Sequence, residues 1–411
     1  MNLDISYKLY SSTNDIHGTV LYPAPMIAPM QVDVLRSIIK GDEHITIMDP
    51  FNGSGVALYE AISNFDNIDI IGYDINPFAN LITKVKLQGI DNNIDEDIEK
   101  LENIIRRKDT IVCEHYFNNI NKWFRKDIII SLSIIKNAIS QIENRKNRLY
   151  FWVIFSNVIR KYSNTRTSTY KLHIKEDIKI SSLVNNSIKF FIAKIKKSYK
   201  YYQNNYENYF LKKCDSLKEM ATMDDFSVDV IITSPPYGDN QTTVPYGQFS
   251  SLPLFWIDST DLELDGWELD NYSIIDSNSM GGKKRTVSNE RLDFIDKFTK
   301  KIGKPKMKKV YNFLDDYIDF MEQISRLTNK YIILTLGNRT VDGVNIDLTE
   351  FSIEYLSYKN FALVTKLNRE IPKKRIPKKT SRVNNKSVKS MSTEFMVIFR
   401  RNESVESIMN N

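Results

Sequence analysis

Cysteine and histidine are scarce in this 411-residue chain, which has two Cys and four His residues. Cys113 and Cys214 cannot build a disulfide framework or a thiolate zinc site, and the scattered histidines do not suggest another metal centre. No apolar run is long enough to span a membrane, and the first residues lack the basic start and apolar stretch of a signal peptide. We therefore expect a cytoplasmic protein with no metal and no membrane partner.

Acidic residues are almost absent from one stretch of the chain, although the net charge of the whole is only +6. Between Lys366 and Lys389 stand ten basic residues and a single acid, Glu370, a net charge of +9. Such a cluster suits the phosphates of a polyanion, and a solvated tether is the alternative. The candidate nucleic-acid contacts in this stretch are Lys373, Lys374, Arg375, Lys378 and Lys379.

A buried-strand pattern near the middle of the chain ends abruptly in two prolines and an aromatic ring. Residues 229–233 read Asp-Val-Ile-Ile-Thr and are followed by Ser234, Pro235, Pro236 and Tyr237. Two prolines fix φ and remove two backbone donors, which leaves nearby carbonyls free to face a ligand. Aimed acceptors beside a flat ring suit a conjugated amino group, such as cytosine N4 or adenine N6. A plain proline-rich strand exit is the alternative.

A glycine-rich turn lies upstream, where residues 49–55 read Asp-Pro-Phe-Asn-Gly-Ser-Gly between an apolar run and a helical pattern. Glycines let the backbone approach a ligand closely. About 20 residues beyond this turn, a second apolar run ends in Asp74, and Asn76 and Pro77 follow. A strand-end carboxylate at this spacing suits a ribose diol. A lone Gly-x-Gly is weak evidence, but the ordered set of three strand-end motifs is specific.

In this order the motifs resemble those of S-adenosylmethionine-dependent DNA amino-methyltransferases of the cytosine-N4/adenine-N6 class, from about His17 to Arg401. The resemblance implies S-adenosyl-L-methionine as cofactor, with its methionine part on the glycine turn. Near the amino terminus, residues 22–24 read Tyr-Pro-Ala and resemble the motif that closes over the cofactor, although Pro25 stands where lysine is common. Asp215 matches the acid at the cofactor's adenine, or is a simple strand-end cap. The implied cofactor residues are Tyr22, Asp49, Pro50, Phe51, Gly53, Gly55, Asp74, Asp215 and Thr233.

The resemblance also implies a direct transfer mechanism. The target base leaves the stack, Ser234 and the Pro235 carbonyl orient its amino group, Tyr237 stacks on it, and the amine attacks the methyl group without a metal or covalent intermediate. The implied catalytic residues are Ser234, Pro235, Pro236 and Tyr237. Family members that act on cytosine N4 usually have Ser before Pro-Pro-Tyr, whereas adenine enzymes usually have Asp or Asn. Ser234 therefore favours cytosine N4.

The implied function is site-specific methylation of double-stranded DNA in a restriction-modification system, with a cognate restriction endonuclease as partner. An adenine-N6 enzyme is one alternative. A non-catalytic DNA-binding specificity protein with the same fold is another, and the intact motifs at Asp49, Gly53 and Asp74 argue against it. Fold-level likeness by itself does not establish the biological role.

The fold class implied is α/β, with a doubly wound Rossmann-like methyltransferase sheet, an antiparallel final hairpin and an inserted helical lobe. About 180 residues separate the glycine turn from the Pro-Pro motif, too many for one crossover. Apolar residues spaced three and four apart predict helices there, as at Ile128, Leu132, Ile135 and Ile139. The predicted units are methyltransferase parts at 1–91 and 206–401, a helical insert at 92–205 and a tail at 402–411.

One stretch of the insert, Ser156–Ser168, is dense in hydroxyl, amide and guanidinium groups. Such groups contact phosphates and base edges, so we expect Arg166 to bind DNA. A polar helix end followed by a solvated loop is the alternative.

Overall fold

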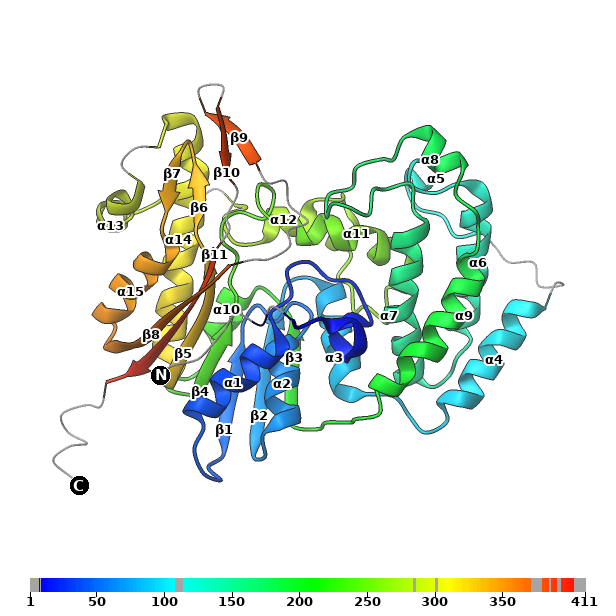
Figure 1. The fold of residues 1–411 in the computed structure, drawn as a ribbon, viewed down its shortest axis with the longest axis horizontal. Coiled ribbons are helices and arrows are strands. Elements are labelled where there is room, and N and C mark those ends of the chain that lie inside the picture. The colour runs from blue at the N-terminus through cyan, green and yellow to red at the C-terminus, as the bar shows by residue number, and fades with distance from the viewer. Residues whose placement is uncertain are drawn as a thin grey trace.

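A seven-stranded sheet forms the centre of the computed structural model, which describes residues 7, 9–107, 114–283, 286–299, 302–370, 379–383, 386–389 and 393–402 (Figure 1). The strand order is β3-β2-β1-β4-β5-β11-β8. The first five strands are parallel, whereas β11 is antiparallel to both neighbours. The strands are β1 (Ile45–Asp49), β2 (Ile68–Asp74), β3 (Tyr209–Lys213), β4 (Val228–Thr233), β5 (Thr328–Gly337), β8 (Phe361–Glu370) and β11 (Thr393–Arg401).

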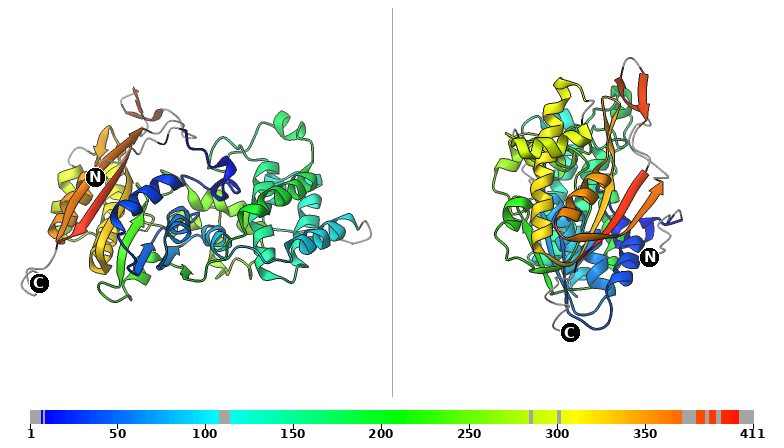
Figure 2. Two further views of the ribbon diagram at one scale, coloured as in Figure 1. Left: turned by 60° about the horizontal axis from the view of Figure 1, so that its bottom comes forward. Right: turned by 90° about the vertical axis from the view of Figure 1, so that its left-hand side faces the viewer.

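Helices cover both faces of this sheet, because successive side chains of a strand point to opposite faces and both sets are apolar. Ile47 packs in a cluster with side chains of α1 (Ala28–Ile38) and α2 (Val56–Asn64). Its neighbour Met48 packs in another cluster, with side chains of α14 (Lys304–Leu327) and α15 (Leu348–Tyr358). Figure 2 shows α14 and the amino-terminal helices on opposite sides of the sheet. The predicted doubly wound sheet with an antiparallel final hairpin is confirmed.

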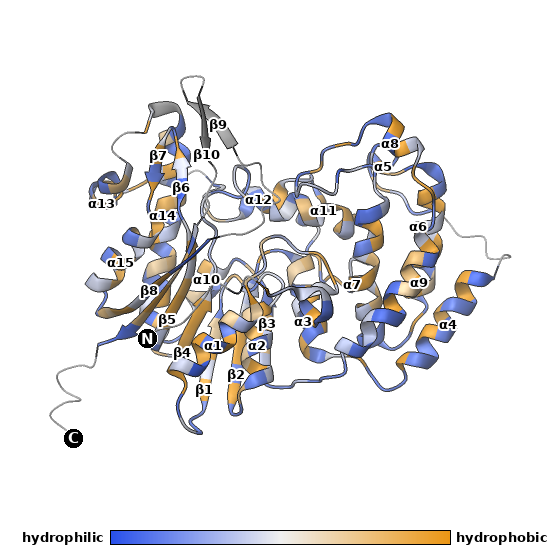
Figure 3. Cartoon of the chain, viewed as in Figure 1, coloured by the Kyte–Doolittle hydropathy of each residue, from blue (hydrophilic) through white to orange (hydrophobic). Residues whose placement is uncertain are grey.

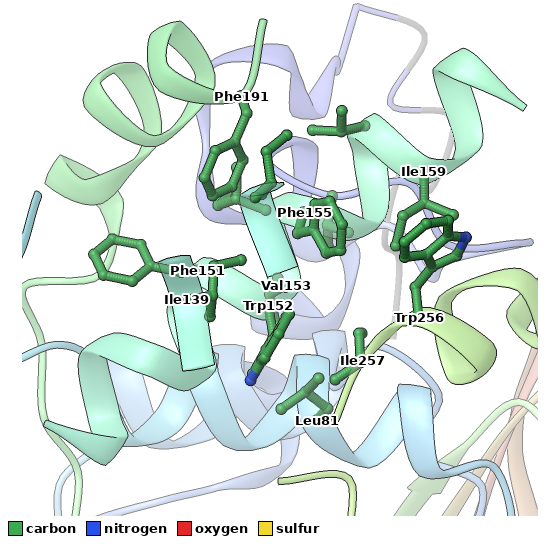
Figure 4. Close-up of a cluster of buried hydrophobic side chains, with 14 of the residues drawn as sticks. Leu81, Ile139, Phe151, Trp152, Val153, Phe155, Ile159, Phe191, Trp256 and Ile257 are labelled. Carbon is green, nitrogen blue, oxygen red and sulfur yellow. The ribbon is translucent and has the colours of Figure 1, made fainter. Parts of the chain in front are cut away.

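A lobe of helices stands beside the sheet (Figure 1). Its core includes Trp152, Phe155 and Trp256, all fully buried (Figure 4). Ile128, Leu132, Ile135 and Ile139, whose spacing predicted a helix, are fully buried in α6. The helices that contribute to this lobe are α3 (Pro77–Gln88), α4 (Ile94–Arg106), α5 (Ile120–Trp123), α6 (Lys126–Ser140), α7 (Arg145–Tyr162), α8 (Asp177–Ser181), α9 (Ser187–Ser198) and α11 (Tyr246–Trp256).

The segment after the Pro-Pro motif also joins this lobe. In α11 the side chains of Phe249 and Trp256 are buried against the insert rather than facing a ligand. Residues 258–276, which follow α11, are rich in acidic side chains, and ion pairs fix their position. Asp261 pairs with Arg148 at 2.8 Å, and the buried Glu268 pairs with Lys213 at 2.6 Å. These contacts hold the stretch between the lobe and the end of β3.

Small elements complete the described chain. Apolar residues concentrate on the central strands and on the inner faces of the helices (Figure 3). The remaining elements are α10 (Ser216–Met220), α12 (Ile274–Asn278), α13 (Asn289–Thr299), the hairpin of β6 (Arg339–Val341) with β7 (Val344–Ile346), the pair of β9 (Lys379–Val383) with β10 (Lys386–Lys389), and four short 3-10 helices at Ser12–Asn14, Ile16–Gly18, Tyr199–Tyr201 and Trp267–Leu269.

The strand register places the root of the basic segment at the carboxyl edge of the sheet. Thr393 of β11 pairs with Glu370 at the end of β8, and Glu394 pairs with Gly337 at the end of β5. This is the edge where ligands of open α/β sheets bind.

Candidate active site

One cavity at the carboxyl edge of the parallel strands collects residues from all three strand-end motifs. It lies where the loops after β1, β2, β3 and β4 meet. The lining residues are Tyr22, Pro23, Ala24, Pro25, Met26, Phe51, Asn52, Gly53, Ser54, Val56, Asp74, Ile75, Asn76, Asp215, Ser216, Leu217, Ser234, Pro236, Asn240, Tyr246, Ile275, Asn278, Ser279 and Met280.

The glycine turn forms one wall. Gly53 and Gly55 have positive φ angles of 50° and 71°, which side chains rarely adopt. A Cβ on Gly55 would lie 2.5 Å from Thr83 Cγ2, so the turn sits directly on α3. Helix α2 begins at the next residue, and no side chain caps its first N–H groups among the described residues. The turn therefore presents backbone donors beside open space, as an anionic ligand group requires.

Two carboxyl groups flank this turn, the partly buried Asp74 and the fully buried Asp49. Asp74 Oδ2 accepts from the Gly53 N–H at 2.9 Å and Oδ1 accepts from the Asn76 N–H at 2.8 Å. Burial raises the pKa of Asp74 to about 6, against the lowering effect of these two bonds. Asp49 Oδ1 accepts from Thr233 Oγ1 at 2.6 Å, and burial raises its pKa to about 7. Asp49 Oδ2 has no hydrogen-bond partner among the described residues.

A buried lysine supports the glycine turn through a hydrogen bond to its backbone. Lys86 of α3 is 1% exposed, and its Nζ donates to the Ser54 carbonyl at 2.6 Å. The same Nζ lies 3.1 Å from Nδ1 of His17, whose Nε2 lies 2.8 Å from Glu60 Oε1. Burial lowers the pKa of Lys86 to about 7. Sequence reasoning missed this residue because a lysine in an apolar helix pattern ordinarily extends to solvent.

The amino-terminal segment lies against the turn through Tyr22. Its ring stacks on Tyr246 with centroids 5.9 Å apart, and its hydroxyl accepts from Asn76 Nδ2 at 3.3 Å. Asn76 Nδ2 also donates to Ser250 Oγ at 2.8 Å. Tyr22 therefore links the amino terminus, the turn after β2 and α11. Pro25, the departure from the family pattern, lines the cavity as well.

At the end of β3, Asp215 lines the cavity, and its side chain makes no cap hydrogen bond to α10. Lys218 Nζ lies 3.8 Å from its Oδ2. The strand-end cap is therefore not the role that this structure gives Asp215.

The Pro-Pro motif leaves β4 at the same edge. Ser234 and Pro236 line the cavity, whereas Pro235 and Tyr237 are not among the lining residues. Tyr237 points its hydroxyl at Ser234 Oγ, 3.1 Å away, and at Glu394 Oε1, 3.2 Å away. Of the implied cofactor residues, Tyr22, Phe51, Gly53, Asp74 and Asp215 line the cavity, whereas Asp49, Pro50, Gly55 and Thr233 are not among its lining residues.

Asn240, on the loop after the Pro-Pro motif whose amides could hold an extruded base, lines the cavity. It is 5% exposed, and its Oδ1 has no hydrogen-bond partner within the described part of the chain. Sequence reasoning missed Met280 and Ser279, because only the packing of α12 brings them to the cavity.

The expected DNA contacts are only partly within the described residues. Arg166 is exposed on the loop after α7, where its backbone N–H donates to the His173 carbonyl at 2.8 Å. Lys379 begins β9, and its side chain is outside the described set. Lys373, Lys374, Arg375 and Lys378 also lie outside the described residues.

The chain is similar over almost its whole length to the type II methyltransferase M.MvaI of Kocuria varians. The two are 29% identical over 428 aligned residues, which cover 95% of this chain and 92% of that protein. This similarity supports an S-adenosylmethionine-dependent methyltransferase. The predicted resemblance to S-adenosylmethionine-dependent methyltransferases is confirmed, and S-adenosyl-L-methionine is the cofactor that methyltransferases of this class use.

Other comparisons cover less or are weaker. The type II methyltransferase M.MjaII of Methanocaldococcus jannaschii is 36% identical over 110 residues, 26% of this chain and 18% of that protein. The rRNA methyltransferase aviRa of Streptomyces viridochromogenes aligns with 95% of this chain and 93% of its own, at 9% identity and a TM-score of 0.31, too low to carry an argument. No protein-family model matches the chain.

The cavity fits this cofactor chemically. The turn offers N–H donors, and Asp74 and Asp215 offer the acceptors that ribose hydroxyls and an adenine amine need. Within the described chain, no group of three or more His, Cys, Asp or Glu side chains is placed to hold a metal. None of its helices combines the length and apolar content needed to cross a bilayer.

Proposed function

We propose that this methyltransferase acts on double-stranded DNA at a specific site and transfers the methyl group of S-adenosyl-L-methionine to the exocyclic N4 amino group of cytosine. The observation that carries the proposal is the shared cavity, because Ser234 lines the same space as Gly53 and Asp74. The similarity to type II methyltransferases supports DNA as the substrate. Ser234 in place of Asp or Asn supports cytosine N4.

The cofactor would lie along the wall formed by the turn after β1. We assign the methionine part to Phe51 and Gly53, with Asp49, Pro50, Gly55 and Thr233 holding the turn from behind. Asp74 would accept from the ribose hydroxyls and Asp215 from the adenine amino group. Tyr22 would close the amino-terminal side. When bound, the cofactor supplies an electrophilic methyl group on a sulfonium.

The target amine would enter at the Ser234 end of the cavity. Ser234 Oγ and the Pro235 carbonyl would accept hydrogen bonds from its two N–H groups and so orient the nitrogen. Pro236 would fix the backbone of the motif, and Tyr237 would fix the ring of the base. Asn240 also lines the cavity, and its buried Oδ1, which has no hydrogen-bond partner among the described residues, would accept from the edge of an extruded base. No water-activating group is needed for such a direct transfer.

DNA would bind over the cavity, against the sheet edge and the helical lobe. We assign phosphate contacts to Arg166 and to the basic segment rooted at Glu370 and Thr393, with Lys373, Lys374, Arg375, Lys378 and Lys379 as its cations. The helical insert at 92–205, joined by α11, would read the bases. A restriction endonuclease that cuts the same site would be the cognate partner.

The deciding experiment is to incubate the protein with unmethylated genomic DNA and S-adenosyl-L-methionine, digest to nucleosides and identify the product by mass spectrometry. We expect N4-methylcytosine. N6-methyladenine would refute the base assignment and retain the enzyme, whereas DNA binding without any modified nucleoside would support a non-catalytic specificity protein.

Two variants separate the two ends of the cavity. Gly53→Val should abolish cofactor binding, because φ is +50°, a backbone angle that a β-branched residue rarely adopts, and the turn that must then change lines the cavity. Pro236→Ala should leave cofactor binding intact and reduce methyl transfer. Isothermal titration with S-adenosyl-L-methionine and a rate assay on DNA measure both, and equal effects of the two variants on both readouts would contradict the assignment.

A further inference from the structure

Four side chains form a continuous hydrogen-bonded chain from the cavity to the root of the basic segment. Ser234 Oγ lies 3.1 Å from the Tyr237 hydroxyl, and that hydroxyl donates to Glu394 Oε1 at 3.2 Å. Arg369 Nη2 donates to Glu394 Oε2 at 2.7 Å. Arg369 and Glu394 are register partners on β8 and β11, so the backbone ladder holds the outer half of the chain.

The outer half is sheltered from water. The side chain of Arg369 is 11% exposed and that of Glu394 is 19% exposed, and the two form an ion pair. Charge-assisted hydrogen bonds of this kind are stronger than bonds between neutral groups. The ion pair therefore fixes the position of Oε1, the oxygen to which Tyr237 donates.

The chemistry of each group fixes the direction of the hydrogen bonds. A guanidinium only donates and a carboxylate only accepts, so the Tyr237 hydroxyl must direct its single proton to Glu394. Burial, reinforced by the charge of Glu394, raises the pKa of Tyr237 well above its usual range, so the phenol keeps that proton. With its proton committed, the phenol oxygen can only accept from Ser234.

It follows that the Ser234 hydroxyl donates its hydrogen bond to the Tyr237 oxygen and directs its lone pairs toward the cavity. An amino group conjugated to a ring offers N–H donors, and a serine that also donated would oppose them. We propose that Glu394 and Arg369 are positioning residues that hold Ser234, through Tyr237, in the accepting state. This proposal rests on the proposed function, because it concerns the group that would receive the target amine.

A double-mutant cycle tests the proposal. Tyr237→Phe removes the acceptor for the Ser234 proton, and Glu394→Gln places an amide where only a carboxylate fixed the direction. We expect each to slow single-turnover methyl transfer at saturating DNA and cofactor by roughly tenfold, the size of one hydrogen bond of about 1.4 kcal/mol. Affinity for S-adenosyl-L-methionine should stay within about twofold, since neither residue lines the cavity.

The cycle is completed by making the same substitutions in a Ser234→Ala background. If Glu394 and Tyr237 act through the serine hydroxyl, their substitutions should add little in the Ser234→Ala background, because coupled groups are non-additive. Losses that multiply fully would overturn the proposal. Glu350→Gln is the matched control, since it removes a carboxylate from an ion pair with Lys366 on β8 that lies outside the chain of four, and it should not change the rate.

A second readout keeps this test separate from the proposed function. In protein labelled with 13C at tyrosine Cζ, the Tyr237 resonance is identified by its loss in Tyr237→Phe. At neutral pH it should change its chemical shift in Glu394→Gln, because the phenol then loses a charged hydrogen-bond acceptor. This spectrum needs no activity, so it decides the Tyr237–Glu394 link even if the wild type methylates no base. An unchanged Tyr237 shift would refute the link, and circular dichroism establishes that each variant is folded.

Discussion

Asp74 Oδ2 accepts a hydrogen bond from the Gly53 backbone N–H at 2.9 Å, so one carboxylate both shapes the turn after β1 and faces the cavity. If this carboxylate accepts from ribose hydroxyls, its ionised form is the one that binds the cofactor. Its pKa is raised to about 6 by burial. Protonation must then compete with cofactor binding as the pH falls through that value.

We therefore expect affinity for S-adenosyl-L-methionine to be constant above pH 7 and to weaken below pH 6, by at most about tenfold per pH unit. Asp74→Asn should weaken binding at pH 8 and remove the dependence near pH 6. Isothermal titration from pH 5 to 8 measures it. Any dependence left near pH 7 belongs to Asp49, whose pKa is raised to about 7, and an unchanged profile in Asp74→Asn would refute the role.

Gly55→Ala should be more harmful than a glycine substitution at the same backbone angle elsewhere. A Cβ at Gly55 would lie 2.5 Å from Thr83 Cγ2, whereas one at Gly41, with φ +69°, would meet nothing within 4 Å. Gly41→Ala should cost about 1 kcal/mol for its positive φ alone. Gly55→Ala should cost more and also weaken cofactor binding. Urea unfolding and titration of both variants measure this, and equal costs would contradict the close approach.

The sheet and the position of the cavity were predictable because the signals are local. Strands β1, β2 and β4 are short apolar runs that end in Asp49, Asp74 and Thr233, and parallel strands bring their carboxyl ends to one edge. The final hairpin was predictable for the same reason, and its strand β8 runs to Glu370.

The residues that the sequence did not reveal depend on long-range packing. Asp276 caps the backbone N–H of Gly247 from 29 positions away, and this contact holds α11 at the cavity. Tyr237 and Glu394 are separated by 157 positions. Neither pair has a local pattern, because the constraint is exerted by the folded sheet and lobe rather than by the neighbouring residues.

Lys86→Met should separate support of the glycine turn from general packing. Methionine keeps the apolar stem and removes the donor to the Ser54 carbonyl, so we expect weaker cofactor binding in a folded protein. Burial lowers the pKa of Lys86 from 10.5 to about 7. Between those values the unfolded chain holds one proton more at this residue, so folded wild type gains stability as pH rises.

The gap in unfolding free energy between wild type and Lys86→Met should therefore move in favour of wild type from pH 7.5 to 9.5, by at most about 1.4 kcal/mol per pH unit. Urea denaturation at both pH values measures the gap. A gap that does not move would mean that the folded protein keeps this lysine in its charged form throughout that range.

Asn240→Leu should reduce affinity for the target base and leave the cofactor site unchanged. The side chain is 5% exposed at the cavity, so leucine fills similar volume without an amide. We expect weaker binding of DNA that carries 2-aminopurine at the target position and a smaller fluorescence rise on base extrusion. Gln241→Leu is the control, because that exposed amide donates to Ser277 Oγ instead. The same loss in both variants would contradict a role for Asn240.

Neutralising the basic segment should change the salt dependence of DNA binding rather than the chemistry. Its root at Glu370 and Thr393 stands at the same sheet edge as Ser234. With Lys373, Lys374, Arg375, Lys378 and Lys379 all changed to Gln, the slope of log K against log salt should become shallower by about 0.9 for each phosphate that the protein no longer neutralises. Lys40→Gln, before β1 at the opposite edge, should leave the slope unchanged.

Fluorescence anisotropy measures the slope between roughly 50 and 200 mM salt, the range over which phosphate contacts lose most of their affinity. An unaltered slope in the variant with all five substitutions would show that the four lysines and Arg375 do not contact the DNA backbone. DNA binding would then rest on Arg166 and the helical lobe.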